Sequence, residues 1–309
     1  MGLSSSGLGS ETSSNVWRSL LLLGNHDDWR VPTLKEVYSL ILFTGTVKGE
    51  KAVSMFIDSK FDQPLGDTNA GEREIDAQTW CSTEYVGKTM NNDDTVFGVN
   101  FVDGRIKGYP KYKPGSTTAN VMYFRMVRGN SDYGKNKFSN NNNGTISDTA
   151  TGLMWQQADD GVSRDWKEAL AYAEGLTLGG HSDWRLPNAK ELQSIVDYSR
   201  SPQTTNSPAI DPIFSVTEIN DPDGNVGHYP FFWTGTTHLD GANPYSGAAY
   251  VTFGEGLGKM NNTLMDVHGA GCQRSDPKSG VKSDYPKFHG PQGDVQYVYN
   301  YVRVVRNID

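Results

Sequence analysis

The sequence has few cysteines and no long apolar run. Only Cys81 and Cys272 occur among 309 residues, and neither belongs to a CxxC pair. A zinc site is therefore not indicated, and two buried, unpaired thiols are favoured over a single bridge. No stretch approaches the roughly 20 apolar residues that a membrane-spanning helix needs. Residues 1–15 are rich in Ser and Gly, lack the apolar segment of a signal peptide, and are expected to be a flexible leader.

Positive charge is also in short supply. The formal net charge is −8, with 28 Lys and Arg against 36 Asp and Glu. Because a nucleic-acid surface needs clustered Lys and Arg, we do not expect nucleic acid as a partner. Glycine, in contrast, is abundant, with 34 residues, while 36% of the chain is hydrophobic. This composition predicts a globular, loop-rich chain with many tight turns.

The chain repeats part of its own sequence. Residues 26–40 return at 181–195, an offset of 155 residues, with Trp, Arg, Pro, Lys, Glu and Ser in register. Further blocks recur in the same order: Phe56–Asp58 with Ala209–Asp211, Trp80–Thr83 with Trp233–Thr236, Val99–Phe101 with Val251–Phe253, and Phe124–Arg128 with Val302–Arg306. We therefore predict a tandem duplication, with a first repeat at 16–129 and a second at 130–309, each burying its own Trp-rich interior.

The two repeats differ in two places. The offset rises from 152 to 178 before the last block, which places an insertion of 26 residues in the second repeat, expected to be a loop at about 262–294. The second repeat also opens with two strand-like pieces around a Thr-Gly turn at 144–155, and nothing similar precedes Trp17. The first repeat is therefore expected to lack its N-terminal hairpin and to leave a strand edge unpaired.

Capping residues mark helices in both repeats. Asn188 with Glu191 and Thr33 with Glu36 form capping boxes, and Ser163 is the expected N-cap of a helix that runs to about residue 176. Short β-branched and aromatic runs follow in the second repeat and have counterparts in the first; they lie at 229–236, 249–253 and 297–305. Each repeat is therefore predicted to be an α+β domain with two helices packed on a small twisted antiparallel sheet.

Four blocks of the second repeat carry a resemblance to a known family. They are Asp148–Trp155, Asp183–Leu192, Trp233–Thr236 and Tyr301–Arg306. In this order they resemble the Lcl C-terminal (DUF1566) family, and the first repeat resembles it except at its opening. The Arg-Leu-Pro block and the final strand are also similar to the formylglycine-generating-enzyme branch of the C-type-lectin-like fold. The resemblance implies two tandem C-type-lectin-like domains in an exported protein, extracellular or at the cell surface, in some cases an adhesin that recognises glycans.

The resemblance carries over no catalytic residue. Formylglycine-generating enzymes bind copper through a close cysteine pair, whereas the two cysteines here lie in different repeats. We therefore expect no enzymatic activity and no cofactor, with calcium as the one candidate. Its candidate ligands are Asp221, Asp223 and Asn225, which alternate around a glycine as in calcium loops. A following Glu at the expected distance is missing, so a plain surface turn is favoured.

The insertion gathers many hydrogen-bonding side chains. They are His268, Gln273, Arg274, Ser275, Asp276, Lys278, His289 and Gln292. This density suits a site for a polyhydroxylated or carboxylated ligand, and it suits equally an internally bonded loop that braces the domain. The repeated Trp-Arg pair at 29–30 and 184–185 could stack on sugars. A core Trp beside an Arg that pairs with an acid is favoured.

These features predict a non-enzymatic binding protein that recognises a glycan or a protein surface. Two alternatives from other classes stay open. One is a structural or accessory subunit of a larger assembly, in which a partner strand completes the first repeat by β-augmentation. The other is an oxidase of the formylglycine-generating type, which the cysteine pattern disfavours.

Overall fold

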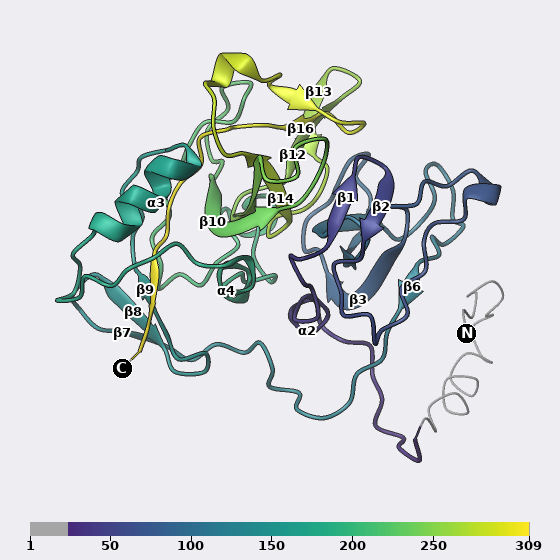
Figure 1. Ribbon diagram of the computed structural model, residues 1–309, viewed down its shortest axis with the longest axis horizontal. Coiled ribbons are helices and arrows are strands. Elements are labelled where there is room, and N and C mark those ends of the chain that lie inside the picture. Colours follow the sequence, from purple (N-terminus) through teal and green to yellow (C-terminus); the bar gives the residue numbers. More distant parts are fainter. Residues whose placement is uncertain (1–23, 309) are drawn as a thin grey trace.

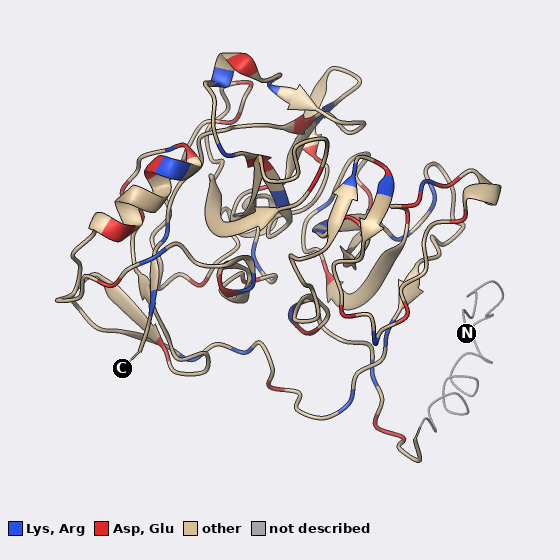
Figure 2. Ribbon diagram, viewed as in Figure 1, with Lys and Arg blue, Asp and Glu red and all other residues tan. Residues whose placement is uncertain are grey.

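The computed structural model describes residues 24–308, so the leader expected at 1–15 lies outside the described residues. The described chain is of the α+β class, built mostly from strands with a few short helices (Figure 1). Among its helices none is long and apolar enough to cross a membrane. Lys and Arg are interspersed with Asp and Glu along the ribbon of both halves (Figure 2).

For description we divide the chain at residue 130. The first half contains α2 (Leu34–Tyr38), β1 (Thr46–Lys48), β2 (Lys51–Ser54), η1 (Thr68–Ala70), β3 (Gln78–Glu84), β4 (Thr95–Asn100), β5 (Arg105–Pro110) and β6 (Tyr123–Phe124). The second half begins with β7 (Phe138–Asn140), β8 (Thr145–Asp148), β9 (Leu153–Gln156), α3 (Trp166–Gly175), α4 (Ala189–Ser194) and α5 (Pro202–Thr205). It continues with β10 (Phe231–His238), β11 (Gly247–Thr252), β12 (Leu257–Met260), β13 (Thr263–Asp266), β14 (Gln273–Pro277), η2 (Lys282–Asp284), β15 (Phe288–His289), β16 (Asp294–Val295) and β17 (Val305–Asn307).

One seven-stranded sheet runs through both halves, in the order β10-β11-β14-β5-β4-β3-β6. The halves meet where β14 pairs antiparallel with β5, at Gln273 and Ile106. The strands on the two sides of this seam are arranged alike. In the second half β14 pairs antiparallel with β11, and β11 with β10; in the first half β5 pairs antiparallel with β4, and β4 with β3. Two sheets predicted as separate are therefore joined edge to edge.

The inserted stretch at 262–294 is not a plain loop, which corrects the prediction. It contains β13, β14, β15 and β16, and β14 is a central strand of the large sheet. The other three strands form, with β12, a separate four-stranded sheet. The sequence offset located an insertion. It did not show that its middle pairs with a strand in the other half, because such pairing leaves no local periodicity.

The core also differs from the expectation of two separate interiors. One cluster of buried side chains draws on both halves, among them Leu34, Phe97, Trp155, Leu192 and Phe232. A second cluster, around Trp184 and Trp233, belongs to the second half alone. Because the main apolar cluster crosses the seam, neither half buries its interior independently.

The capping boxes predicted for α2 and α4 are confirmed. The Thr33 and Asn188 side chains accept from the backbone N–H of Glu36 and Glu191, whose carboxylates accept in return from the backbone N–H of the cap. In α3 the N-cap is Asp165, not the predicted Ser163. Asp165 has a Glu three residues on, which completes a capping box that Ser163 could not form.

The run at 297–305 was predicted as a strand, and only its last residue belongs to one. Val298 has a φ of 64°, which interrupts an extended chain. The carboxylate of Asp276 accepts from the backbone N–H of Val298 at 3.1 Å and from the side chain of Asn300 at 3.0 Å. These contacts fix the segment in an irregular path across β14.

Several contacts occur once in each half. Arg30 pairs with Glu36 as Arg185 pairs with Glu191, and a threonine hydroxyl accepts from the first N–H of the helix, at 3.0 Å in both α2 and α4. Arg128 pairs with Asp28 as Arg306 pairs with Asp183, each at 2.7 Å. The prediction that Arg30 and Arg185 each pair with an acid is therefore confirmed. Trp184 is buried, as expected for a core residue, whereas Trp29 is half-buried.

Candidate functional site

Most of the predicted ligand-binding side chains contact other side chains of the protein, in the second half or across the seam. The alternation of β14 sends Gln273 and Ser275 to one face and Arg274 and Asp276 to the other. Gln273 accepts from the Tyr38 hydroxyl at 3.2 Å, and Ser275 lies 2.9 Å from a ring nitrogen of His238. Gln273 and Asp276 are at most 1% exposed.

The remaining predicted residues also contact other side chains of the protein. Arg274 and His268 flank Asp294, and the Nε2 of His268 lies 2.9 Å from that carboxylate. Lys278 donates to Thr237 at 2.6 Å and its ammonium lies 4.4 Å from the ring centre of Trp166. His289 belongs to β15, and Gln292 contacts the sulfur of Met90. These contacts favour the bracing interpretation, and ligand binding by this set stays a prediction.

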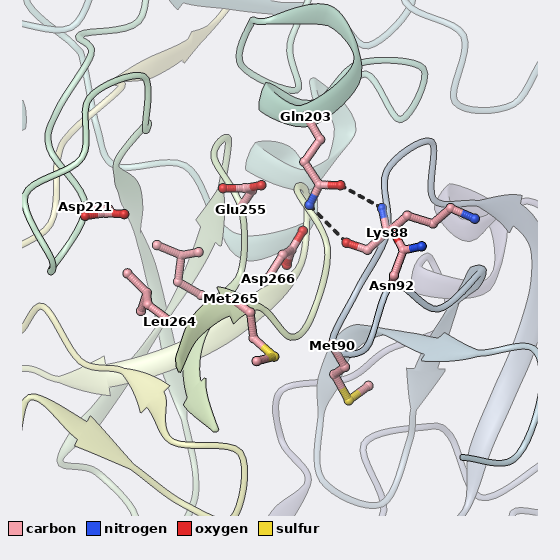
Figure 3. Close-up of a pocket in the computed structure, with 10 residues that line it drawn as sticks. Lys88, Met90, Asn92, Gln203, Asp221, Glu255, Leu264, Met265 and Asp266 are labelled. Carbon is pink, nitrogen blue, oxygen red and sulfur yellow. Dashed lines mark hydrogen bonds between the residues drawn. The ribbon is translucent and has the colours of Figure 1, made fainter. Parts of the chain in front are cut away.

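A different cavity lies at the junction of the halves (Figure 3). Its volume is about 350 Å³, at the lower end of the range for small-molecule sites. The loop after β3 and the loops around β12 and β13 build it together with α5. The lining residues are Lys88, Met90, Asn92, Gln203, Asp221, Glu255, Leu257, Leu264, Met265 and Asp266. We call this cavity the junction pocket.

Backbone contacts hold the two walls of the junction pocket together. Gln203 in α5 accepts from the N–H of Lys88 at 2.8 Å and donates to its carbonyl at 3.0 Å (Figure 3). The N–H of Met90 donates to the carbonyl of Asp266 at 2.7 Å. The first-half loop is thereby fixed on the second half, and the pocket is built before any ligand arrives.

Two carboxyl groups in the junction pocket have raised pKa values. Burial raises the pKa of Glu255, the charge of Asp221 adds to this effect, and a hydrogen bond with Gln203 opposes it. Burial also raises the pKa of Asp266 to about 7, and the nearby charge of Glu255 acts in the same direction. The Tyr85 hydroxyl donates to Asp266 at 2.7 Å. The pocket can therefore present either charged oxygens or a protonated carboxyl group at neutral pH.

The candidate calcium residues form a tight turn at the edge of the same pocket. One oxygen of Asp221 accepts from the N–H of Asp223 at 2.9 Å and of Asn225 at 2.8 Å, and the other accepts from the Asn225 side chain. Asp223 pairs with Lys259 at 3.1 Å. In the described part of the chain, no group of three or more His, Cys, Asp or Glu side chains could hold a metal ion. The turn is thus observed, and calcium binding stays a prediction.

A second cavity, of about 370 Å³, lies beside α2 and the segment at 131–138. Burial lowers the pKa of its Lys35 to about 8. This ammonium donates to Gly134 and Asn136 at 3.0 Å and to the carbonyl of Ser194 at 2.6 Å. Because its three donors are used, Lys35 ties α2, the connecting segment and α4 together and leaves little for a ligand.

The junction pocket was not predicted from the sequence. Lys88, Gln203, Glu255 and Asp266 come from four separate segments, and none of them belongs to a recognisable motif. Only Asp221 had been singled out, as a candidate calcium ligand. Both cysteines are free and buried, as favoured from the sequence.

The fold and this pocket define an α+β protein with a polar site where two halves of one sheet meet. Residues 144–269 match the family model of the Lcl C-terminal domain. The match includes the second-half wall of the junction pocket and ends before β14. No curated protein and no solved structure matches the chain.

Proposed function

We propose that the chain is an exported, non-enzymatic binding protein that recognises a glycan or similar polyhydroxylated ligand in the junction pocket. The observation that carries this proposal is the composition of the pocket. Glu255, Gln203 and Asn92 offer carboxylate and amide groups, while Leu257, Leu264 and Met265 offer apolar contact. Sugars need both, since their hydroxyl groups form hydrogen bonds and their C–H faces pack on apolar side chains.

We also propose that the halves arose by tandem duplication, at the boundaries predicted from the sequence, and that each is related to the C-type-lectin-like fold. The paired Arg–Glu contacts, the paired capping boxes and the matched strand order about the β14–β5 seam support the duplication. In this view the duplication created the binding site, because the pocket has walls from both halves.

The buried thiols support the non-enzymatic assignment over the formylglycine-generating alternative. Burial raises the pKa of both Cys81 and Cys272 to about 12, which leaves them protonated at neutral pH.

A glycan array probed with the full chain, with and without calcium, tests the proposal. We expect a defined set of glycans to bind, and Glu255→Gln to weaken their binding by about tenfold, as expected for loss of one charge-assisted hydrogen bond. Glu174→Gln is the matched control, because Glu174 is an exposed α3 residue remote from the pocket lining.

Three results would contradict the proposal: no glycan binding by the wild type, unchanged binding by Glu255→Gln, or equal loss in both variants. Calcium dependence of binding would additionally support the candidate ligands Asp221, Asp223 and Asn225. Binding that is indifferent to calcium would remove calcium as a cofactor and leave the pocket assignment in place.

A further inference from the structure

The C-terminal strand of the second half is paired on both sides. On one side, Val305 exchanges backbone hydrogen bonds with Arg185 at 2.9 and 3.0 Å. On the other, β17 pairs antiparallel with β9, and Trp155 lies opposite Val305. Figure 1 shows this strand running beside the β8–β9 hairpin. The N–H groups of Gln156 and Ile308 extend the pairing at both ends, at 3.1 and 2.8 Å.

Among the described residues, the corresponding strand of the first half is paired on one side only. Val127 exchanges backbone hydrogen bonds with Arg30, both at 2.9 Å, as Val305 does with Arg185. By the alternation of an extended strand, the backbone groups of Met126 and Arg128 point the other way. Among residues 24–308 no hydrogen-bond partner is found for these groups. They are the unpaired groups of the segment 126–130, in which the carbonyl of Asn130 accepts from the Arg30 side chain at 3.4 Å; we call this segment the acceptor edge.

An arginine beside each strand shows what the acceptor edge lacks. In the second half, Arg303 donates to the carbonyls of Gln156 and Gln157, at 2.7 and 2.6 Å, and to that of Ser215 at 2.7 Å. In the first half, Arg125 donates to the carbonyl of Asp62 at 2.7 Å, which corresponds to the contact of Arg303 with Ser215. Arg125 also donates to the Gln63 side chain. The Nε atoms of Arg125 and Arg303 are both buried without a partner in the described chain, so the two arginines differ only in the contacts of their terminal nitrogens. The missing acceptors are the two carbonyls that β9 and its following residue supply.

The aromatic side chain beside each of these arginines is buried in the second half and exposed in the first. The guanidinium of Arg303 lies 5.2 Å from the ring centre of Phe214, and that of Arg125 lies 5.5 Å from Phe61. Phe214 is 4% exposed, whereas Phe61 is 41% exposed. In the second half, β7 contributes Phe138 against Phe214, with ring centres 5.1 Å apart, and β9 contributes the fully buried Trp155.

We propose that the acceptor edge binds an extended strand from a partner protein, which completes the first half as β9 completes the second. The partner strand runs antiparallel to 126–130 and carries bulky apolar side chains at alternate positions, as Leu153 and Trp155 do in β9. The two carbonyls after its aromatic residue accept from Arg125. The partner strand thereby covers Phe61 and pairs with the N–H and carbonyl of Arg128. This inference rests on the comparison of the halves and is independent of the junction pocket.

A labelled peptide with the sequence of residues 147–157 of this chain is the probe, because β9 is the strand known to fit. We expect saturable binding to the full-length protein. Arg128→Pro removes a backbone donor that has no partner among residues 24–308 and should weaken binding by about fivefold to tenfold relative to Arg128→Ala. The alanine variant is the matched control, since both variants lose the exposed ion pair with Asp28.

Phe61→Ser provides a second, independent variant at an exposed position, and Phe61→Leu is its control. We expect only the serine variant to lose about fivefold in peptide affinity, because the leucine keeps an apolar surface. Absence of saturable binding, or equal affinity of the wild type, Arg128→Pro and Phe61→Ser, overturns the proposal. Equal affinity would mean that the peptide exchanges with the hairpin of the second half.

Hydrogen exchange at 126–130 distinguishes a partner strand from the other occupants. We expect fast exchange in the isolated chain and slow exchange with the peptide bound. Protection in the isolated chain at every concentration would show that the chain itself covers the edge, and protection only at high concentration would show a second copy. Either result overturns the proposal, and neither bears on glycan binding in the junction pocket.

Discussion

At the scale of single residues, the junction pocket contains two carboxyl groups whose pKa values are raised. Burial raises the pKa of both Asp266 and the half-buried Glu255; the charge of Glu255 adds to the effect at Asp266, and that of Asp221 adds to the effect at Glu255. Ionisation of a buried carboxyl group destabilises the folded protein, and a ligand that donates hydrogen bonds to the carboxylate offsets part of this destabilisation. If the pocket binds its ligand as proposed, we expect that binding to depend on pH near neutrality.

Replacement of Asp266 by Asn tests this ionisation directly. Because its folded pKa of about 7 lies above the unfolded value, Asp266 binds its proton more tightly in the folded protein. The stability linked to that proton is complete below about pH 4 and is lost as the pH rises through 7. We expect Asp266→Asn to be more stable relative to the wild type at pH 8 than at pH 5, by roughly 1–3 kcal/mol in urea unfolding. Glu174→Gln should show no such change, and an equal difference at both pH values would contradict the assignment.

At the scale of helices and strands, local contacts were predictable and long-range ones were not. The starts of α2 and α4 followed from Thr33–Glu36 and Asn188–Glu191, because a capping box needs only four consecutive residues. Ser163 was the predicted cap of α3, but Asp165 caps it, because only Asp165 has a glutamate three residues later to complete the capping box. The central position of β14 could not be predicted, since its partner β5 lies in the other half and strand pairing has no sequence signature.

The α4 cap gives the prediction at this scale. Asn188→Ala should lower the free energy of unfolding by about 1 kcal/mol, since it leaves the N–H of Glu191 without its acceptor. Asn188→Asp keeps an acceptor and should lose much less. Urea unfolding at pH 7 measures both. Equal losses for Ala and Asp would show that the contribution comes from packing of the side chain and not from the cap.

At the scale of the whole molecule, the seam between β14 and β5 makes one body from two similar halves. The shared sheet and the shared apolar cluster bury side chains that either half alone would expose. The repeat could be recognised from the sequence because its blocks keep their order. The seam and the pocket could not, since both arise from contacts between segments that carry no common motif. The site therefore belongs to the assembled pair of halves.

Unfolding should accordingly be cooperative across the seam. We expect a single calorimetric transition for the full chain, with the van't Hoff and calorimetric enthalpies in agreement. Residues 130–309 expressed alone should be markedly less stable, because the free edge of β14 and its apolar neighbours would face water. Two separate transitions, one of them reproduced by the isolated second half, would contradict a shared core.

The most direct test of the account is the location of a bound glycan. Amide chemical shifts of the full-length protein, followed while the strongest glycan from the array is added, show which segments contact the ligand. We predict that residues on both walls respond together, Lys88 and Asn92 from the first half with Gln203 and Glu255 from the second. Shifts confined to one half, or a response elsewhere while these four residues stay unchanged, would contradict a binding site made by both halves.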